Sequence, residues 1–424
     1  MGISNHTSKY GTSYNKQTQS TQSQTDEMFN ELKRVLTERC HSPLVMEKEF
    51  VASSEGHFST FEDYDIRMVQ VVTRHGERAP MFATALIGMK IFYCPDGSRQ
   101  LFSASDLSHT VCYKAQMTWT GCRQLQLIGR HFRKAYSFNL TVGQLENRIR
   151  LLSTGRQRTD WSARCLVAGL LGHTNYNKLV RVNLAMVPYA LHTKYVKSCP
   201  YREKLLNQIR KNLKYQQSAS YWTSAVNRGN SFITATGYNG RNLTYIHQFN
   251  EALVSHFCNL YHKGISASIT PCVKKHCMPP SLSLEILKAA DVHVKSQNDQ
   301  KISLVNIQPL LGQIVSEMEI SATGQTKSVF IHYSGHDITM SSLLSALGAF
   351  YGRQPAYATR LVFELWSERK YNNRYKVRVL HDGQVLKSSV LDEWMTLKFF
   401  KERILHGHLR DPKSHRNACL KGIW

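Results

Sequence analysis

The sequence predicts an α/β fold, in which a wound sheet is flanked by helices and carries a mainly helical inserted cap. Two stretches of the chain alternate short apolar, β-rich segments with segments of helical periodicity, a pattern typical of such a sheet. The stretch between them, about 175–300, is mostly helical in pattern. The chain has 424 residues, 42% of them apolar and 20% charged, so it can bury a large core.

The amino-terminal residues 1–40 are predicted to lie outside the globular domain. Residues 1–26 are rich in Ser, Thr, Gln and Asn, which cannot build a core, so we expect a disordered tail there. Residues 27–39 are amphipathic and should form a short helix. The globular domain is then expected at 41–420, with the cap at about 175–300. The sequence shows no hydrophobic leader and no apolar run of about 20 residues that could anchor it in a membrane.

The first strand–helix stretch opens with the apolar, β-rich segment 65–73, which predicts a buried strand. Three further elements are predicted after it: a helix at 118–136, a strand with a loop at 150–155, and a helix at 159–171. Either Thr118 or Thr120 can cap the first of these helices, because a threonine hydroxyl accepts from the free N–H groups of a helix start.

The second strand–helix stretch follows the cap. Its predicted elements are a helix at 303–319, a strand at 329–333, a helix at 338–347, and strands at 359–366 and 375–380. Asp382-Gly383 comes directly after the last of these strands, and this dipeptide favours a tight hairpin turn.

Ten cysteines are scattered along the chain without a closely spaced pair, which favours disulfides formed in an oxidising compartment. Three glycosylation sequons, at Asn5, Asn139 and Asn242, agree with the secretory pathway. A zinc site remains an alternative for one group, although its spacing is unusual. That group is Cys258, His262, Cys272 and Cys277.

The chain carries 54 Lys and Arg against 30 Asp and Glu, a formal net charge of +24. Such a surplus favours anionic partners, among them phosphorylated substrates and acidic glycans. The positive charge is spread along the chain and no nucleic-acid motif stands out, so we expect no nucleic-acid partner.

Two arginines flank a histidine directly after the first predicted strand, in the segment Arg74-His75-Gly76-Glu77-Arg78-Ala79-Pro80. Arginine is the best side chain for a phosphate, because its planar guanidinium can bond two oxygens at once. A neutral imidazole held between such groups can attack phosphorus and form a phosphohistidine. The segment therefore predicts a phosphate site with His75 as nucleophile.

A second motif, Gly335-His336-Asp337, follows another predicted strand and opens a helix. His336 can donate to phosphoryl oxygens, and Asp337 can protonate the leaving alcohol. Arg156 and Arg158 lie near the start of a third helix, where free backbone N–H groups favour a bound phosphate. We expect Arg158 to bind phosphate, with Arg156 as its rival.

These motifs resemble those of the histidine acid phosphatases, and the likeness covers about residues 63–420. The resemblance implies a phosphoglycerate-mutase-like α/β core with a helical cap. It implies that His75 is the nucleophile and Asp337 the proton donor, without a metal ion or cofactor. The phosphate pocket that it implies consists of Arg74, Arg78, Arg158 and His336.

Within the family, several carboxyl-terminal stretches resemble a Golgi member that removes the 2-phosphate from xylose in the glycosaminoglycan–protein linkage region. This implies a phosphorylated glycan substrate and a place in the secretory pathway, in the Golgi lumen. It also implies an amino-terminal membrane anchor, which this sequence does not show. The alternatives are a broad-specificity secreted or lysosomal acid phosphatase, and an inactive relative that binds glycans.

Overall fold

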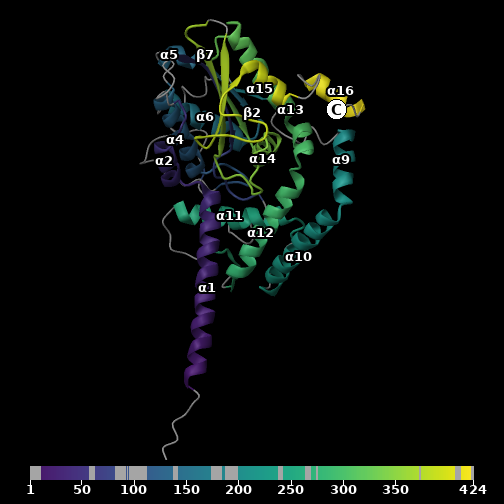
Figure 1. The fold of residues 1–424 in the computed structure, drawn as a ribbon. Coiled ribbons are helices and arrows are strands. Elements are labelled where there is room, and N and C mark those ends of the chain that lie inside the picture. The colour runs from purple at the N-terminus through teal and green to yellow at the C-terminus, as the bar shows by residue number, and fades with distance from the viewer. Residues whose placement is uncertain are drawn as a thin grey trace, which may run out of the picture.

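A central mixed sheet organises the fold (Figure 1). The computed structural model describes residues 11–56, 63–81, 92, 94, 112–136, 142–172, 184–186, 199–236, 242–262, 269–273, 276–371, 374–405 and 412–421. Within them the strand order is β10-β8-β7-β1-β6-β2-β3, with β9 beside β8. The strands are β1 Tyr64–Arg74, β2 Ile149–Ser153, β3 Leu184–Met186, β6 Phe330–Gly335, β7 Arg360–Glu368, β8 Tyr375–His381, β9 Gln384–Val385 and β10 Met395–Thr396.

Strands β1, β6, β2 and β3 run parallel, whereas β7, β8 and β10 are antiparallel to their neighbours. The predicted α/β fold class is confirmed. The predicted hairpin turn is also present, because Asp382 and Gly383 both have positive φ, at 46° and 85°, as such turns require.

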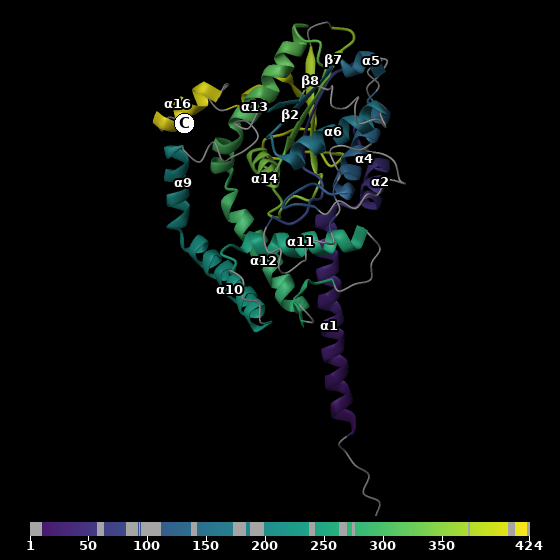
Figure 2. The ribbon, with the colours of Figure 1, turned by 180° about the vertical axis from the view of Figure 1, so that it is seen from behind.

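Helices cover both faces of the sheet. One face carries α2 Pro43–Val51, α4 Trp119–Ala135, α5 Val142–Glu146 and α6 Gln157–Leu171, and the other carries α13 Gln300–Ala322, α14 Asp337–Ala346 and α15 Leu397–Ile404 (Figures 1 and 2). Strand β1 is buried on both faces from Met68 onward, as parallel strands between two helical layers are. Helices α4 and α6 touch at Gly129, where a Cβ would lie 1.9 Å from Leu166 O, and the disulfide Cys122–Cys165 joins them.

Most of the cap lies beyond the end of the sheet, whereas its first helix, α9 Pro200–Arg210, lies beside α13 and α16 Pro412–Lys421 (Figure 2). Its other described helices are α10 Leu213–Ala235, α11 Ile246–His262 and α12 Pro280–Gln297. The predicted helical character is therefore present in the described part of this segment. Its predicted start near 175 needs correction, because β3 lies inside that range and pairs with β2 in the central sheet. Residues 184–186 therefore belong to the central sheet.

Helix α1, Gly11–Cys40, is longer than predicted. The sequence predicted disorder for residues 1–26 and a helix for 27–39, yet α1 already begins at Gly11. Leu32 and Leu36 are fully buried against the cap and hold the carboxyl-terminal half of the helix. Extending an anchored helix costs little, and glutamine is a good helix former, so helix and polar composition are compatible here.

All ten cysteines form disulfides, as predicted. The pairs are Cys40–Cys258, Cys94–Cys112, Cys122–Cys165, Cys199–Cys419 and Cys272–Cys277. The alternative zinc site is wrong, because its three cysteines are consumed in two of these bonds. The last two pairs hold α9 to α16 Pro412–Lys421 and close the short hairpin of β4 Cys272–Val273 and β5 His276–Cys277. Among the described helices, none combines the length and the apolar character needed to span a bilayer.

Candidate active site

The two predicted motifs meet at the carboxyl edge of the sheet. Strands β1 and β6 are parallel neighbours, in a register that places Arg74 beside Gly335. The backbone N–H of His75 donates to Gly335 O at 3.1 Å, which ties the first motif to the second. A Cβ on Gly76 would lie only 2.3 Å from Gly121 O, so glycine is required where this loop crosses the start of α4.

A cavity of about 190 Å³ opens between this edge and the cap. All six residues predicted for the site line it: Arg74, His75, Arg78, Arg158, His336 and Asp337. The rival Arg156 does not line it; this residue is exposed and its backbone caps the start of α6. We refer to this cavity as the phosphate pocket.

His75 is 2% exposed and is surrounded by cations. Its pKa lies well below 6.5, because burial disfavours the charged ring and because Arg158, Arg74 and Arg78 add positive charge around it. The ring is therefore neutral. Its Nδ1 lies 2.8 Å from Gly76 O, which can only accept, so Nδ1 carries the proton. The lone pair is left on Nε2, the nitrogen that can act as a nucleophile.

The three arginines of the pocket are held by few partners. Arg74 lies over the ring of Tyr357 at 4.2 Å, and Arg78 forms a buried ion pair with Glu251 of α11. Desolvation, followed by repulsion from Arg78, lowers the pKa of Arg158 to about 10. The Nε atoms of all three arginines are buried without a hydrogen-bond partner among the described residues. An anion in the pocket would supply the missing acceptors.

Asp337 begins α14 at the edge of the pocket. Its Oδ2 accepts from Gln354 Nε2 at 2.5 Å, and Gln354 Oε1 in turn accepts from Asn250 Nδ2 at 2.5 Å. Desolvation would raise the pKa of Asp337, but the charge of Arg74 and the bond from Gln354 outweigh it and hold this pKa below its usual range. The carboxyl is therefore ionised in the free protein.

Both ring nitrogens of His336 have partners inside the protein. Nε2 lies 3.0 Å from Thr154 Oγ1, and Nδ1 lies 3.4 Å from Arg158 Nη2. A guanidinium can only donate, so Nδ1 of a neutral His336 accepts and Nε2 carries the proton. The histidine thus positions Arg158, and donation from Nδ1 to a phosphate would require protonation of the ring.

Sequence reasoning missed the residues that line the far side of the pocket. Glu251 and His247 come from α11 of the cap, and Gln354 and Tyr357 come from the segment between α14 and β7. None of them stands in a recognisable motif, because the fold brings them to the pocket from distant parts of the chain.

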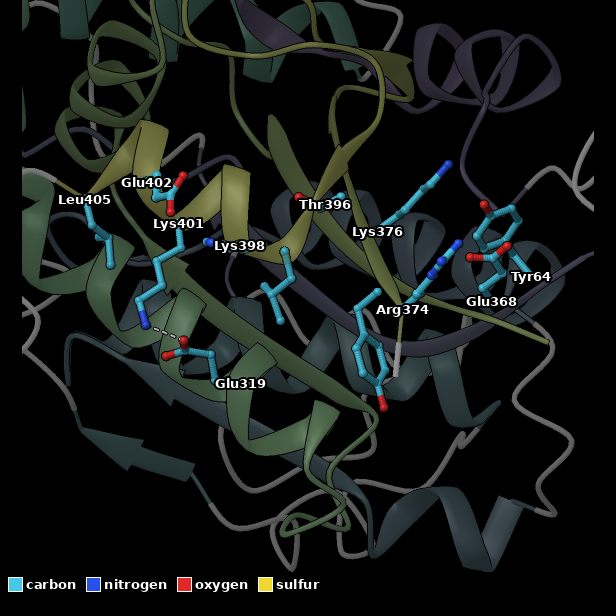
Figure 3. A pocket seen from close by; sticks show the side chains of 12 residues that line it. Tyr64, Glu319, Glu368, Arg374, Lys376, Thr396, Lys398, Lys401, Glu402 and Leu405 are labelled. Carbon is cyan, nitrogen blue, oxygen red and sulfur yellow. Dashed lines mark hydrogen bonds and ion pairs between the residues drawn. The ribbon is translucent and has the colours of Figure 1, made fainter. Parts of the chain in front are cut away.

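A larger cavity, of about 1030 Å³, lies elsewhere (Figure 3). It includes Tyr64 at the start of β1 and Glu368 at the end of β7, so it sits at the opposite end of the sheet from the phosphate pocket. Its lining mixes basic and acidic side chains, and Lys401 is ion-paired with Glu319 (Figure 3). It contains no residue predicted for the site, and this mixture gives it no clear preference for anions.

Comparisons with known proteins agree with the geometry. The family model of the histidine phosphatase superfamily (branch 2) matches residues 65–382. The chain is 27% identical to mouse 2-phosphoxylose phosphatase 1 over 386 residues, covering 81% of this chain and 75% of that protein. It is 25% identical to rat lysosomal acid phosphatase over 333 residues, covering 75% of this chain and 71% of that protein.

Solved structures show the same fold. The phytase from Citrobacter braakii superposes with a TM-score of 0.55 at 14% sequence identity, covering 82% of this chain and 99% of the phytase. The family model spans most of the chain, and its matched range contains both motifs of the pocket. The chain therefore belongs to branch 2 of the histidine phosphatase superfamily and is a phosphomonoesterase.

Proposed function

We propose that the chain hydrolyses phosphomonoesters through a phosphohistidine formed at His75. The observation that carries this is the state of the His75 ring, which is neutral, has its proton on Nδ1, and lines the same pocket as three arginines. A phosphate dianion held by Arg74, Arg78 and Arg158 brings phosphorus to this nitrogen. The P–N bond forms as the P–O bond to the leaving alcohol breaks.

Asp337 delivers the proton to the leaving oxygen in this scheme. The carboxyl is ionised in the free protein because Arg74 and Gln354 stabilise its charge. A bound phosphate offsets the charge of Arg74, so the pKa of Asp337 rises on binding and the carboxyl takes up a proton at acidic pH. In the second step the carboxylate accepts a proton from the water that attacks the phosphohistidine, which releases inorganic phosphate and restores His75.

We propose as substrate a phosphate on the 2-position of xylose in the glycosaminoglycan–protein linkage region. The similarity to mouse 2-phosphoxylose phosphatase 1 over 81% of the chain supports this choice. The net charge of +24 suits a growing acidic glycan. The five disulfides agree with an oxidising compartment of the secretory pathway, and the substrate would place the enzyme in the Golgi lumen.

A broad-specificity acid phosphatase is the second candidate, favoured by the similarity to rat lysosomal acid phosphatase. The two candidates differ in how they rank substrates. A xylose-specific enzyme should give a kcat/KM at least about 100-fold higher for a 2-phosphoxylosyl trisaccharide than for 4-nitrophenyl phosphate. Equal values would favour the broad enzyme, and glycan binding without turnover of either compound would favour an inactive relative.

The covalent step has its own test. The enzyme is mixed with ³²P-labelled substrate and quenched within milliseconds at alkaline pH, where a P–N bond survives. Label is expected on the peptide that contains His75. The matched control is His336→Ala, which keeps the nucleophile and should still be labelled. Label on any other side chain would contradict the proposed nucleophile.

A further inference from the structure

A second cavity, of about 500 Å³, lies in the cap. Its walls are the middle of α10, the segment that leads into α11, and one residue of α12. Its described lining contains aromatic rings and uncharged amides, and no Lys, Arg, Asp or Glu stands among these described residues. The lining includes Trp222, Asn227, Asn242, Tyr245 and His293. We refer to it as the cap cavity.

Consecutive residues at the start of α11 line the cap cavity and the phosphate pocket. His247 lines the phosphate pocket and Tyr245 lines the cap cavity. Their rings are stacked, with centroids 5.3 Å apart and planes 11° from parallel. Tyr245 is 59% exposed, so its ring is accessible next to His247 of the phosphate pocket. A molecule bound in the phosphate pocket could therefore continue over these rings.

The sizes of the two cavities are complementary. Pockets that bury a small-molecule ligand usually measure about 300–1,000 Å³. The phosphate pocket, at about 190 Å³, holds a phosphoryl group but not the rest of a large substrate. The cap cavity, at about 500 Å³, lies within the usual range. The non-reacting part of a substrate thus has a place next to the reacting part.

The polar groups of the cap cavity suit an uncharged ligand with many hydroxyls. His293 Nδ1 is buried and has no hydrogen-bond partner among the described residues. Its pKa is lowered to about 4, by burial and then by His247, so the ring is neutral. Asn230 holds the wall in place, because its amide exchanges two hydrogen bonds with the backbone of Leu243. Amides and a neutral imidazole both donate and accept, as sugar hydroxyls do.

We propose that the cap cavity is an oligosaccharide subsite, which binds the sugars next to the phosphorylated residue. Trp222 and Tyr245 offer apolar ring faces to the C–H faces of the sugars, and the amides and His293 bond their hydroxyls. This proposal rests on the proposed glycan substrate and extends it, because the cap would then be the part of the enzyme that recognises the neighbouring sugars. Selectivity for an oligosaccharide over an aryl phosphate then arises from remote contacts.

The first test compares two substrates on matched variants. Trp222→Ala and Tyr245→Ala should each lower kcat/KM for a 2-phosphoxylosyl trisaccharide by about tenfold, which corresponds to about 1.4 kcal/mol. The kcat/KM for 4-nitrophenyl phosphate should stay within about twofold, since this compound fits the phosphate pocket alone. Tyr221→Ala is the matched control, because Tyr221 is an exposed neighbour on α10 that does not line the cavity. Equal losses on both substrates, or none, would overturn the proposal.

The second test does not depend on turnover. Calorimetry should detect binding of the unphosphorylated trisaccharide to the intact protein, weakened about tenfold by Trp222→Ala. If phosphoxylose is not hydrolysed but this binding remains, the proposed substrate fails and the subsite stands. If the trisaccharide does not bind although phosphoxylose is hydrolysed, the subsite fails alone.

The sequon at Asn242 gives the cavity a rival occupant, a glycan attached to the chain itself. Thr244→Val removes the sequon but keeps the amide of Asn242. The kcat/KM for the 2-phosphoxylosyl trisaccharide should be unchanged in this variant if the cavity receives substrate. A rise in turnover would show that the attached glycan fills the cavity, and the subsite would be rejected.

Discussion

Two groups of buried charge lie on neighbouring strands and differ in how their charges are matched. In the first, Arg360 of β7 donates from Nε and Nη2 to the two carboxylate oxygens of Glu55, at 2.8 and 3.0 Å. Nearby, Glu364 accepts from Arg378 Nε and from Tyr136 Oη, both at 2.6 Å. Each carboxylate of this group has a cation bonded to it. We call it the paired cluster.

The phosphate pocket has the opposite character. Three arginines, Arg74, Arg78 and Arg158, line it together with only two described carboxylates, Glu251 and Asp337, so the pocket carries an excess of positive charge. Desolvated charge without a partner destabilises a fold, so such a group persists only where the surrounding structure holds it. The comparison teaches that burial of charge does not mark a site. An excess of one charge does, and it also indicates that the ligand carries the opposite charge.

The largest expected effect is on turnover. His75→Ala should reduce kcat by at least about 10⁴-fold, because no other described group can take the place of its Nε2. The midpoint of urea unfolding should fall less than in a variant that breaks a buried ion pair, because the neutral ring pairs with no charge and only its packing is lost. A loss of stability as large as that of a broken ion pair would contradict this difference between the two groups.

Arg360→Met should instead lower stability strongly and change kcat little. Removing the guanidinium leaves the buried carboxylate of Glu55 with only His131 and Ser53 as partners. This loss should cost about 3–5 kcal/mol in the free energy of unfolding, measured with urea. The double variant with Glu55→Gln should recover part of this loss, since no buried charge is then left alone. The folded fraction should keep most of its kcat. If activity disappears while stability remains, the distinction between the two groups is wrong.

The role of Asp337 as proton donor can be tested by how the rate depends on the leaving group. Asp337→Asn should slow an alkyl phosphate by about 10²–10³-fold, because an alkoxide needs a proton to leave. An aryl phosphate should lose less than about tenfold, because a phenolate leaves without one. Equal losses on both compounds would mean that Asp337 acts through charge and not as a proton donor.

Replacing Gln354 should have the smallest effect on kcat of the variants considered. Gln354→Leu removes the hydrogen bond to Asp337 Oδ2 and should lower kcat on the alkyl phosphate by about tenfold. This bond stabilises the ionised carboxyl, so its loss should also raise the pKa of Asp337. The basic limb of the pH profile of kcat/KM should then move to higher pH, because Asp337 must be protonated to act. A lower kcat with an unmoved limb would indicate a merely structural role.

The difference between the two sides of the phosphate pocket also explains what the sequence could predict. His75 and His336 follow apolar strands directly, so local pattern placed both at one edge of a sheet. Glu251 and Gln354 depend on how the cap packs, and no local pattern encodes that packing. Strand β3 was missed because three residues are too short to show an alternation. Helix α1 was mispredicted because its amino-terminal half depends on an anchor further along the chain.

The disulfide Cys40–Cys258 has a consequence for how the enzyme matures. It fixes the end of α1 to α11 across 218 residues of chain. The adjacent Arg39 donates to Asn250, the same residue whose amide bonds Gln354 beside Asp337. A nascent chain in which this bond has not yet closed would have its nucleophile loop but not a fixed proton donor. The enzyme would therefore become active only once this disulfide has formed. A reductant should abolish activity at a concentration at which the protein is still folded.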